Sequence, residues 1–239
     1  YMQNKKKILL LSDDLRMSSG VGTMSREFVL GTLEHYQWVQ IGGAIKHPDE
    51  GKIIDMNETC RKETGIEDAY LKIYPVSGYG NGDLLKQVLD METKDGEGID
   101  AILHYTDPRF WGWLYNMEHE IRQNIPIFYY NIWDDLPYPR WNENYYESCD
   151  LIMNISKQTH NIVQNVCQRE ERTEINSTYI PHGINHKSFF PMTKEQKQDE
   201  KYIDFKKNAV KGVDRDFILF YNARNIKRKM VGDIILSYN

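Results

Sequence analysis

The sequence of 239 residues has few cysteines, no long apolar run and no surplus of positive charge. Its three cysteines, Cys60, Cys149 and Cys167, are widely spaced, so neither a disulfide framework nor a Cys-x-x-Cys metal site is indicated. We therefore expect a reducing, cytoplasmic compartment. No stretch approaches the roughly 18 consecutive apolar residues of a membrane-spanning helix, and the apolar run 8–11 is too short for a signal peptide.

The charge balance also excludes some partners. The formal net charge is −5, which argues against stable nucleic-acid binding because neutralisation of phosphates dominates that affinity. The Asp-x-Asp pattern at 214–216 lies in a charged stretch and is interpreted as solvated, so no metal cofactor is expected. A hydrophobic content of 40% with 27% charged residues is typical of a globular protein that can bury a sizeable core.

Short apolar strands alternate with helices along most of the chain. Continuous apolar runs predict buried parallel strands, and spacings of three and four predict amphipathic helices. Strands are expected at 7–12, 37–43, 70–74, 101–104, 127–131, 151–154 and 178–180, and helices at 20–34, 83–91, 113–122 and 156–166. The polar stretch between 43 and 70 is expected to be irregular. This alternation predicts a Rossmann-like α/β fold with a doubly wound parallel sheet.

The composition divides the chain into three parts. Residues 1–191 form the expected Rossmann-like domain, and residues 192–215 are a charged linker or exposed helix. Residues 216–239 are expected to begin a second Rossmann-like domain, with a strand at 216–222 and a helix at 230–238.

Gly20 and Gly22 lie between the first strand and the first helix, where open α/β sheets bind ligands. Glycines let backbone amides approach a ligand closely, and a helix N-terminus favours phosphate or sugar oxygens. The third glycine of a dinucleotide-binding fingerprint is absent. A structural turn is the alternative interpretation of this loop.

Other polar side chains fall at the ends of predicted strands. Asp13-Asp14 and Asp134-Asp135 are candidates for binding sugar hydroxyls or assisting proton transfer, with loop starts and helix caps as the alternative. His104, with Asp107 close by, is a candidate active-site group or a buried, hydrogen-bonded histidine. The aromatic run 128–146 can stack on sugars or pack in the core.

Two cations follow the predicted strand at 216–222. Arg224 and Lys229 are placed to neutralise a diphosphate leaving group, and a solvated basic loop is the alternative.

Four motifs follow one another along the chain. They are Ser19-Gly20-Val21-Gly22, residues 100–108, Ile180-Pro181-His182-Gly183-Ile184-Asn185 with Phe189-Phe190-Pro191, and Arg224-x4-Lys229. Their order and spacing resemble the pattern of the retaining GT-B glycosyltransferases called glycosyltransferase family 4. The resemblance extends over nearly the whole chain.

The resemblance implies roles for individual residues. Gly20 and Gly22 match the loop that approaches the donor diphosphate, and Arg224 and Lys229 match the pair that holds it. His182 and Gly183 match the end of the first domain and would shape the cleft together with Asp14. Trp133 stands where the family usually has a histidine near the reacting sugar. The candidate catalytic residues are therefore Asp134, His104, Asp107 and Trp133.

The sequence thus predicts transfer of a sugar from a nucleotide diphosphate-sugar to a small-molecule or glycan acceptor, with retention implied by the family. In this family the first domain mainly recognises the acceptor, and a Glu-x7-Glu motif that the sequence does not reach would hold the donor. We therefore expect the 239-residue chain alone to be inactive. Two alternatives remain: a non-catalytic domain that binds a sugar or a partner, and another Rossmann-like enzyme such as an epimerase or a nicotinamide-dependent oxidoreductase.

Overall fold

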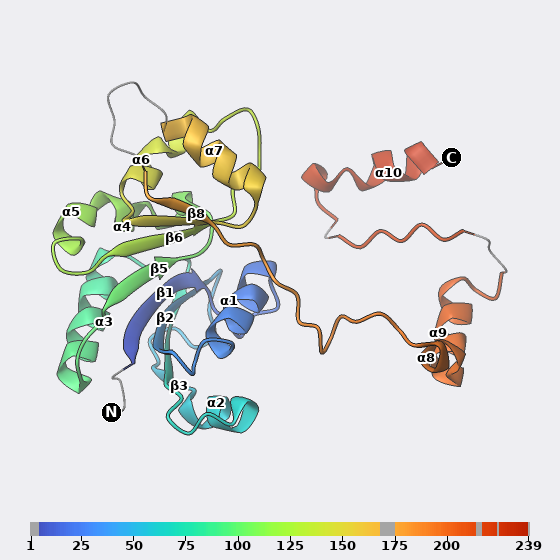
Figure 1. Ribbon diagram of the computed structural model, residues 1–239, viewed down its shortest axis with the longest axis horizontal. Helices are drawn as coiled ribbons and strands as arrows, with labels where there is room; N and C mark the ends of the chain where they lie inside the picture. Colours follow the sequence, from blue (N-terminus) through green and yellow to red (C-terminus); the bar gives the residue numbers. More distant parts are fainter. Residues whose placement is uncertain (1–4, 168–174, 214–216, 224, 239) are drawn as a thin grey trace. The chain divides into compact units, whose positions relative to one another are not determined.

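The computed structural model describes residues 5–167, 175–213, 217–223 and 225–238 (Figure 1). The chain forms two compact units, Tyr1–Ile184 and Asn185–Asn239. Within the described residues, none of the helices has both the length and the apolar composition needed to cross a membrane.

The first unit is built on one sheet of eight strands. They are β1 (Lys6–Asp13), β2 (Tyr36–Ala44), β3 (Ile54–Asp55), β4 (Leu71–Ser77), β5 (Ala101–His104), β6 (Ile127–Asn131), β7 (Leu151–Asn154) and β8 (Ser177–Tyr179). The strand order is β3-β4-β2-β1-β5-β6-β7-β8, and every pair is parallel except the short β3 against β4. The Rossmann-like α/β prediction is confirmed.

Helices cover both faces of this sheet. They are α1 (Gly20–Leu30), α2 (Asn57–Thr64), α3 (Gly82–Asp95), α4 (Gly112–Asn116), α5 (Glu118–Ile121), α6 (Glu143–Glu147) and α7 (Lys157–Cys167), with 3-10 turns η1 (Pro108–Trp111) and η2 (Arg140–Asn142). Alternate residues of β1 point to opposite faces, so Leu10 packs in the cluster that contains Val29 of α1, while Leu9 and Leu11 pack in the cluster that contains Val88 of α3. The two helices accordingly lie on opposite sides of the sheet (Figure 1).

The expected elements differ from the structure in two places within the first unit. The stretch between 43 and 70, expected to be irregular, contains β3 and α2. Its helix buries only Cys60, so the sequence carries no apolar stripe that would predict it. The single helix expected at 113–122 is instead divided into α4 and α5, with the break at Met117.

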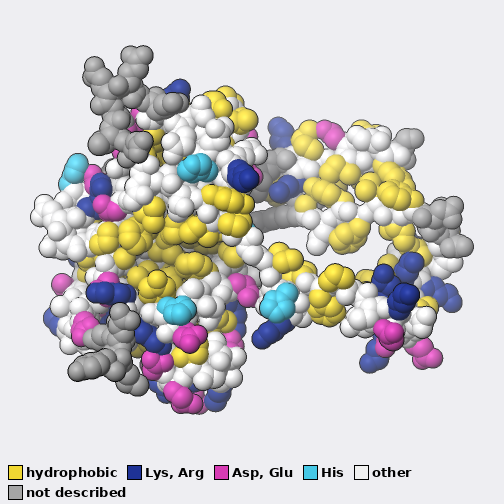
Figure 2. Space-filling view, viewed as in Figure 1, with side chains coloured by type: hydrophobic (Ala, Val, Ile, Leu, Met, Phe, Trp, Pro, Cys, Tyr) yellow, Lys and Arg dark blue, Asp and Glu magenta, His cyan; other side chains and the backbone are white. Residues whose placement is uncertain are grey.

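The second unit contains α8 (Lys194–Gln198), α9 (Glu200–Ala209), η3 (Lys227–Lys229) and α10 (Val231–Tyr238). The helix expected at 230–238 is confirmed as α10. The strand expected at 216–222 was wrong for the described residues 217–223, which join no sheet. A strand needs a neighbour for its backbone hydrogen bonds, and no other strand is present in the described part of this unit. The apolar side chains of the described residues 217–223 are largely exposed, Phe217 at 68% and Phe220 at 81%. Hydrophobic side chains accordingly show on the surface of the second unit (Figure 2).

Candidate functional site

The candidate site lies at the carboxyl end of β1. In the sheet β1 has β2 on one side and β5 on the other, so the chain order reverses between β1 and β5. Open α/β sheets bind ligands at such a switch point, outside the carboxyl ends of the strands. In the register of this pair Leu11 is opposite His104, which places Asp13 beside the loop that begins at Tyr105.

The loop after β1 presents backbone amides at the start of α1. Ser19 caps the helix, because its Oγ accepts a hydrogen bond from the Gly22 amide at 2.9 Å and donates one to Asp13 Oδ2 at 2.8 Å. The amides of Gly20 and Val21 have no acceptor among the described residues. The helix N-terminus therefore offers two free N–H donors next to a fixed carboxylate.

The two glycines of this loop serve different purposes. A Cβ on Gly22 would lie 2.7 Å from the Met17 carbonyl oxygen and 2.9 Å from that of Asp14, so the helix packs on the loop only because this side chain is absent. A Cβ on Gly20 would meet nothing within 4 Å. Gly20 therefore faces open space, where a ligand can approach its amide.

Substituting each glycine by alanine tests whether the packing of the loop needs a glycine at position 22 but not at position 20. We expect Gly22→Ala to lower the free energy of unfolding by about 1–3 kcal/mol, because backbone atoms must move to admit the new methyl group. Gly20→Ala is expected to raise it by up to about 1 kcal/mol, because alanine restricts the unfolded chain. Urea unfolding followed by circular dichroism measures both, and equal effects would contradict the difference in packing.

Asp13 and Asp14 also differ. The Asp14 carboxylate is fully buried and accepts hydrogen bonds from Arg16 N, Nε and Nη2 and from His47 Nε2, the last at 2.8 Å. Burial raises the pKa of Asp14, but the bonds from Arg16 and His47 outweigh it and hold this pKa below its ordinary value. Asp13 is partly exposed, and Tyr79 OH reaches it at 3.5 Å. Asp13 is thus the residue of the pair whose carboxylate faces the site.

His104 is fully buried at the end of β5. Its Nδ1 lies 2.6 Å from Tyr115 OH, its ring stacks on Tyr129 at 4.9 Å, and its Nε2 has no partner among the described residues. Burial lowers the pKa of His104 to about 3. The side chain is therefore a neutral imidazole in the core, which matches the buried alternative more closely than an exposed proton donor.

The buried state of His104 predicts a pH dependence. Its pKa falls from 6.5 in the unfolded chain to about 3 in the fold, so the unfolded chain binds the proton more readily. The contribution of neutral His104 to the free energy of unfolding is therefore complete above about pH 6.5 and is lost as the pH falls towards 3. We expect the imidazole resonances of His104 to stay constant from pH 8 to pH 4.5 in an NMR titration. A midpoint near pH 6.5 would contradict this placement.

Asp107 and Trp133 are joined by a residue that the sequence analysis did not single out. Arg109 binds both Asp107 oxygens through Nε, at 2.9 and 3.1 Å, and places its guanidinium 5.1 Å from the centre of the Trp133 ring. Burial raises the pKa of Asp107, but the bonds to Arg109 outweigh it and hold this pKa below its ordinary value. The signal in the sequence that could have indicated this ion pair is the spacing of Arg109 two residues after Asp107.

Further aromatic rings lie on the loops that carry Arg109 and Trp133. Phe110 stacks on Tyr79 at 4.9 Å with an interplanar angle of 3° and is 51% exposed. Trp133 contacts Trp141 edge-on at 6.3 Å, and Trp141 is 61% exposed. Asp134 follows Trp133 on the exposed loop after β6, and no described residue bonds to its carboxylate. The loops after β5 and β6 thus present exposed rings beside charged groups.

His182 lies near the end of the first unit. Its ring contacts those of Tyr105 and Tyr130 edge-on, and its Nε2 lies 3.4 Å from Tyr105 OH. Burial lowers the pKa of His182. The Tyr105 pKa is raised, mainly by burial and further by the charges of Tyr130 and Asp13. Gly183 follows on the surface.

The predicted cation pair belongs to the second unit. Arg224 lies outside the described residues. Lys229 ends η3, and its carbonyl oxygen accepts a hydrogen bond from Tyr221 OH at 2.9 Å. A joint diphosphate site of these cations with Gly20 and Gly22 stays a prediction. Across the described ranges no group of three or more His, Cys, Asp or Glu side chains is arranged to hold a metal ion.

Comparison with known proteins gives structural likenesses but no family. No protein-family model matches the sequence, and no curated protein matches it. Among solved structures, the chain is similar to HepE from Anabaena, solved in complex with UDP and glucose, with 11% identity and a TM-score of 0.49. The match covers 86% of this chain and 50% of the HepE chain, so this chain spans about half the length of that protein.

Proposed function

We propose that this chain belongs to a glycosyltransferase that moves a sugar, with retention, from a nucleotide diphosphate-sugar to an acceptor hydroxyl. One observation carries the proposal: the free amides of Gly20 and Val21 lie beside Asp13 at the switch point between β1 and β5. Amides at a helix N-terminus stabilise phosphate oxygens, while a carboxylate accepts hydrogen bonds from sugar hydroxyls. A nucleotide diphosphate-sugar presents both kinds of group.

The rings beside the site support a sugar as the second ligand. Phe110 and Trp141 are exposed, and aromatic faces can pack on the C–H faces of a pyranose ring. Arg109 and Asp134 supply a donor and an acceptor for hydroxyls at the same edge. In this proposal Asp134 binds the acceptor hydroxyl, and Gly20 faces the donor diphosphate, which Arg224 and Lys229 neutralise from the second domain.

The experiment is a ligand panel read by thermal unfolding of the 239-residue chain. Sugar nucleotides, including UDP-glucose, are expected to raise the unfolding midpoint, because a ligand that binds only the folded state stabilises it. NAD is not expected to raise it, because the third glycine of the dinucleotide-binding fingerprint is absent. Arg224→Ala and Lys229→Ala should each reduce the shift, with Lys194→Ala as a control for lost positive charge. A shift with NAD alone would favour a nicotinamide-dependent oxidoreductase.

A non-catalytic binding domain is the second candidate function. It is favoured by Trp133, which stands where the resemblance leads one to expect a histidine, and by the burial of His104. A stabilising shift with sugar nucleotides, but no transfer by the complete protein, would support it.

A further inference from the structure

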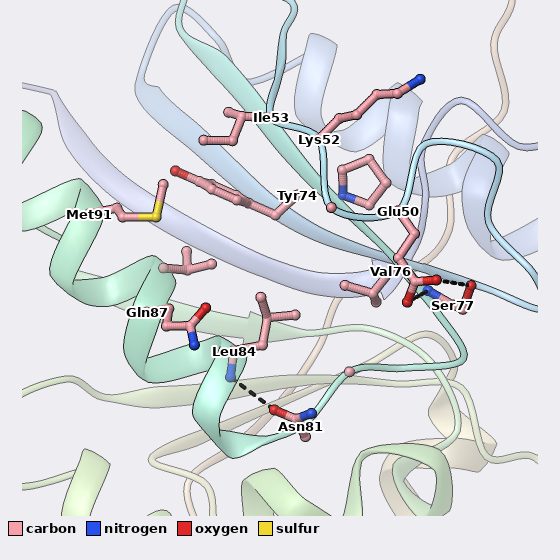
Figure 3. A pocket seen from close by; sticks show the side chains of 14 residues that line it. Glu50, Lys52, Ile53, Tyr74, Val76, Ser77, Asn81, Leu84, Gln87 and Met91 are labelled. Atoms are coloured by element: carbon pink, nitrogen blue, oxygen red, sulfur yellow. Dashed lines mark hydrogen bonds between the residues drawn. The ribbon is translucent and has the colours of Figure 1, made fainter.

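A pocket of about 450 Å³ lies between β4, α3 and the loop that precedes β3 (Figure 3). Its volume is within the range of roughly 300–1,000 Å³ in which proteins bind small molecules. None of the candidate site residues discussed above lines it.

The floor of this pocket is apolar. Tyr74 and Val76 of β4 and Val88 of α3 are buried and form the base, and Leu84 adds to the wall from α3. Ile53, which is 51% exposed, lines the opposite wall (Figure 3). Burial of a ligand's apolar surface here would contribute about 25 cal/mol per Å².

One carboxylate is fixed at the rim. Glu50 accepts hydrogen bonds from the Ser77 amide at 3.1 Å and from Ser77 Oγ at 2.7 Å, one on each oxygen (Figure 3). These bonds lower the pKa of Glu50, so the carboxylate is ionised at neutral pH. Each oxygen keeps a lone pair for a ligand. Among the described residues that line the pocket, the one lysine or arginine is Lys52, which is bound to Asp49 at 2.8 Å.

Both loops around the pocket are anchored on the end of β1. His47 binds Asp14 through Nε2, and its backbone amide donates a hydrogen bond to Ser77 Oγ at 3.0 Å, which holds its loop to the end of β4. On the other side, Tyr79 reaches Asp13. A pocket whose walls are fixed in this way needs little ordering when a ligand binds.

We propose that this pocket binds a small molecule that combines an apolar ring with a hydrogen-bond donor, either a hydroxyl or an ammonium group. The ring packs against Leu84 and Ile53 above the floor formed by Tyr74 and Val76, and the donor group binds the free lone pairs of Glu50. A carboxylate-bearing ligand is repelled by Glu50. This inference does not depend on the proposed transferase function.

Three probes with the same ring test it: 2-phenylethanol, phenethylamine and phenylacetate, titrated into the 15N-labelled chain. Saturable amide shifts are expected at Ser77, Gly80 and Asn81 with the alcohol and the amine, and binding of phenylacetate should be at least ten times weaker. Glu50→Gln should remove the preference for the amine over the carboxylate. The matched control is Glu58→Gln, an exposed carboxylate of α2 paired with Lys62, which should leave the preference unchanged.

A second variant tests the location without disturbing the core. Gln87 lines the pocket from the exposed side of α3, so Gln87→Trp should fill the space and abolish the shifts for all three probes. The proposal is overturned if no probe binds, if the shifts arise elsewhere, if phenylacetate binds as well as the amine, or if Gln87→Trp leaves binding unchanged.

Discussion

Replacing Glu92 by alanine is expected to lower the free energy of unfolding by about 3–5 kcal/mol. Its fully buried carboxylate accepts hydrogen bonds from Lys7 Nζ at 3.1 Å, Tyr70 OH at 3.0 Å and Tyr74 OH at 2.8 Å. Without it, the ammonium of Lys7, itself only 6% exposed, has no carboxylate partner in the core. For a chain of this size the thermal midpoint should fall by roughly 6–20 °C.

The control for this variant lies on the same helix. Asp95→Ala removes an exposed carboxylate that binds Lys72 at 3.0 Å, and it should change the midpoint little, because solvent already screens this pair. The double variant Lys7→Met with Glu92→Leu should recover part of the loss, since it removes both buried charges. If Glu92→Ala is as stable as Asp95→Ala, the buried network does not stabilise the fold.

Replacing Asp14 by alanine is expected to lower the free energy of unfolding by about 3 kcal/mol. The substitution removes the carboxylate partner of buried His47 and one of the two that hold Arg16, the other being Asp49. The neighbouring variant Asp13→Ala is the matched control, and it should affect ligand binding more than stability.

The Asp14 pKa fixes the pH at which this contribution disappears. Because the folded pKa lies below the ordinary value of 3.8, the contribution is complete above about pH 3.8 and is lost as the pH falls through the folded value. Asp14→Asn should therefore flatten the acid side of the stability profile. A larger loss of stability in Asp13→Ala than in Asp14→Ala would reverse the assignment of the two residues.

The strands of the sheet could be predicted because each is encoded by a short run of apolar residues in the sequence. The continuous apolar run that contains Leu9, Leu10 and Leu11 serves both faces of the sheet, and glycines followed by an apolar stripe marked α1. Helix α2 could not be predicted in this way, since Cys60 is its only buried residue. The strand expected at 216–222 has the right side chains, but its described residues 217–222 pair with no other described strand, and pairing is a property of the tertiary structure.

The candidate site could be predicted only in outline. The position of Gly20 at the edge of the sheet followed from the order of elements. The sequence could not tell Asp13 from Asp14, because the difference arises from His47, which is distant in the chain. Likewise, His104 is buried by the rings of Tyr115 in α4 and Tyr129 in β6, and the sequence around His104 does not predict these contacts.

The central claim is that the start of α1 binds the diphosphate of a sugar nucleotide. The most direct test is an amide NMR titration of the chain with UDP-glucose at millimolar concentration, with glucose and NAD as controls. We predict saturable shifts of the Gly20 and Val21 amides with UDP-glucose, and none at these two amides with either control. If these two amides do not respond to UDP-glucose, or respond equally to NAD, the claim is contradicted.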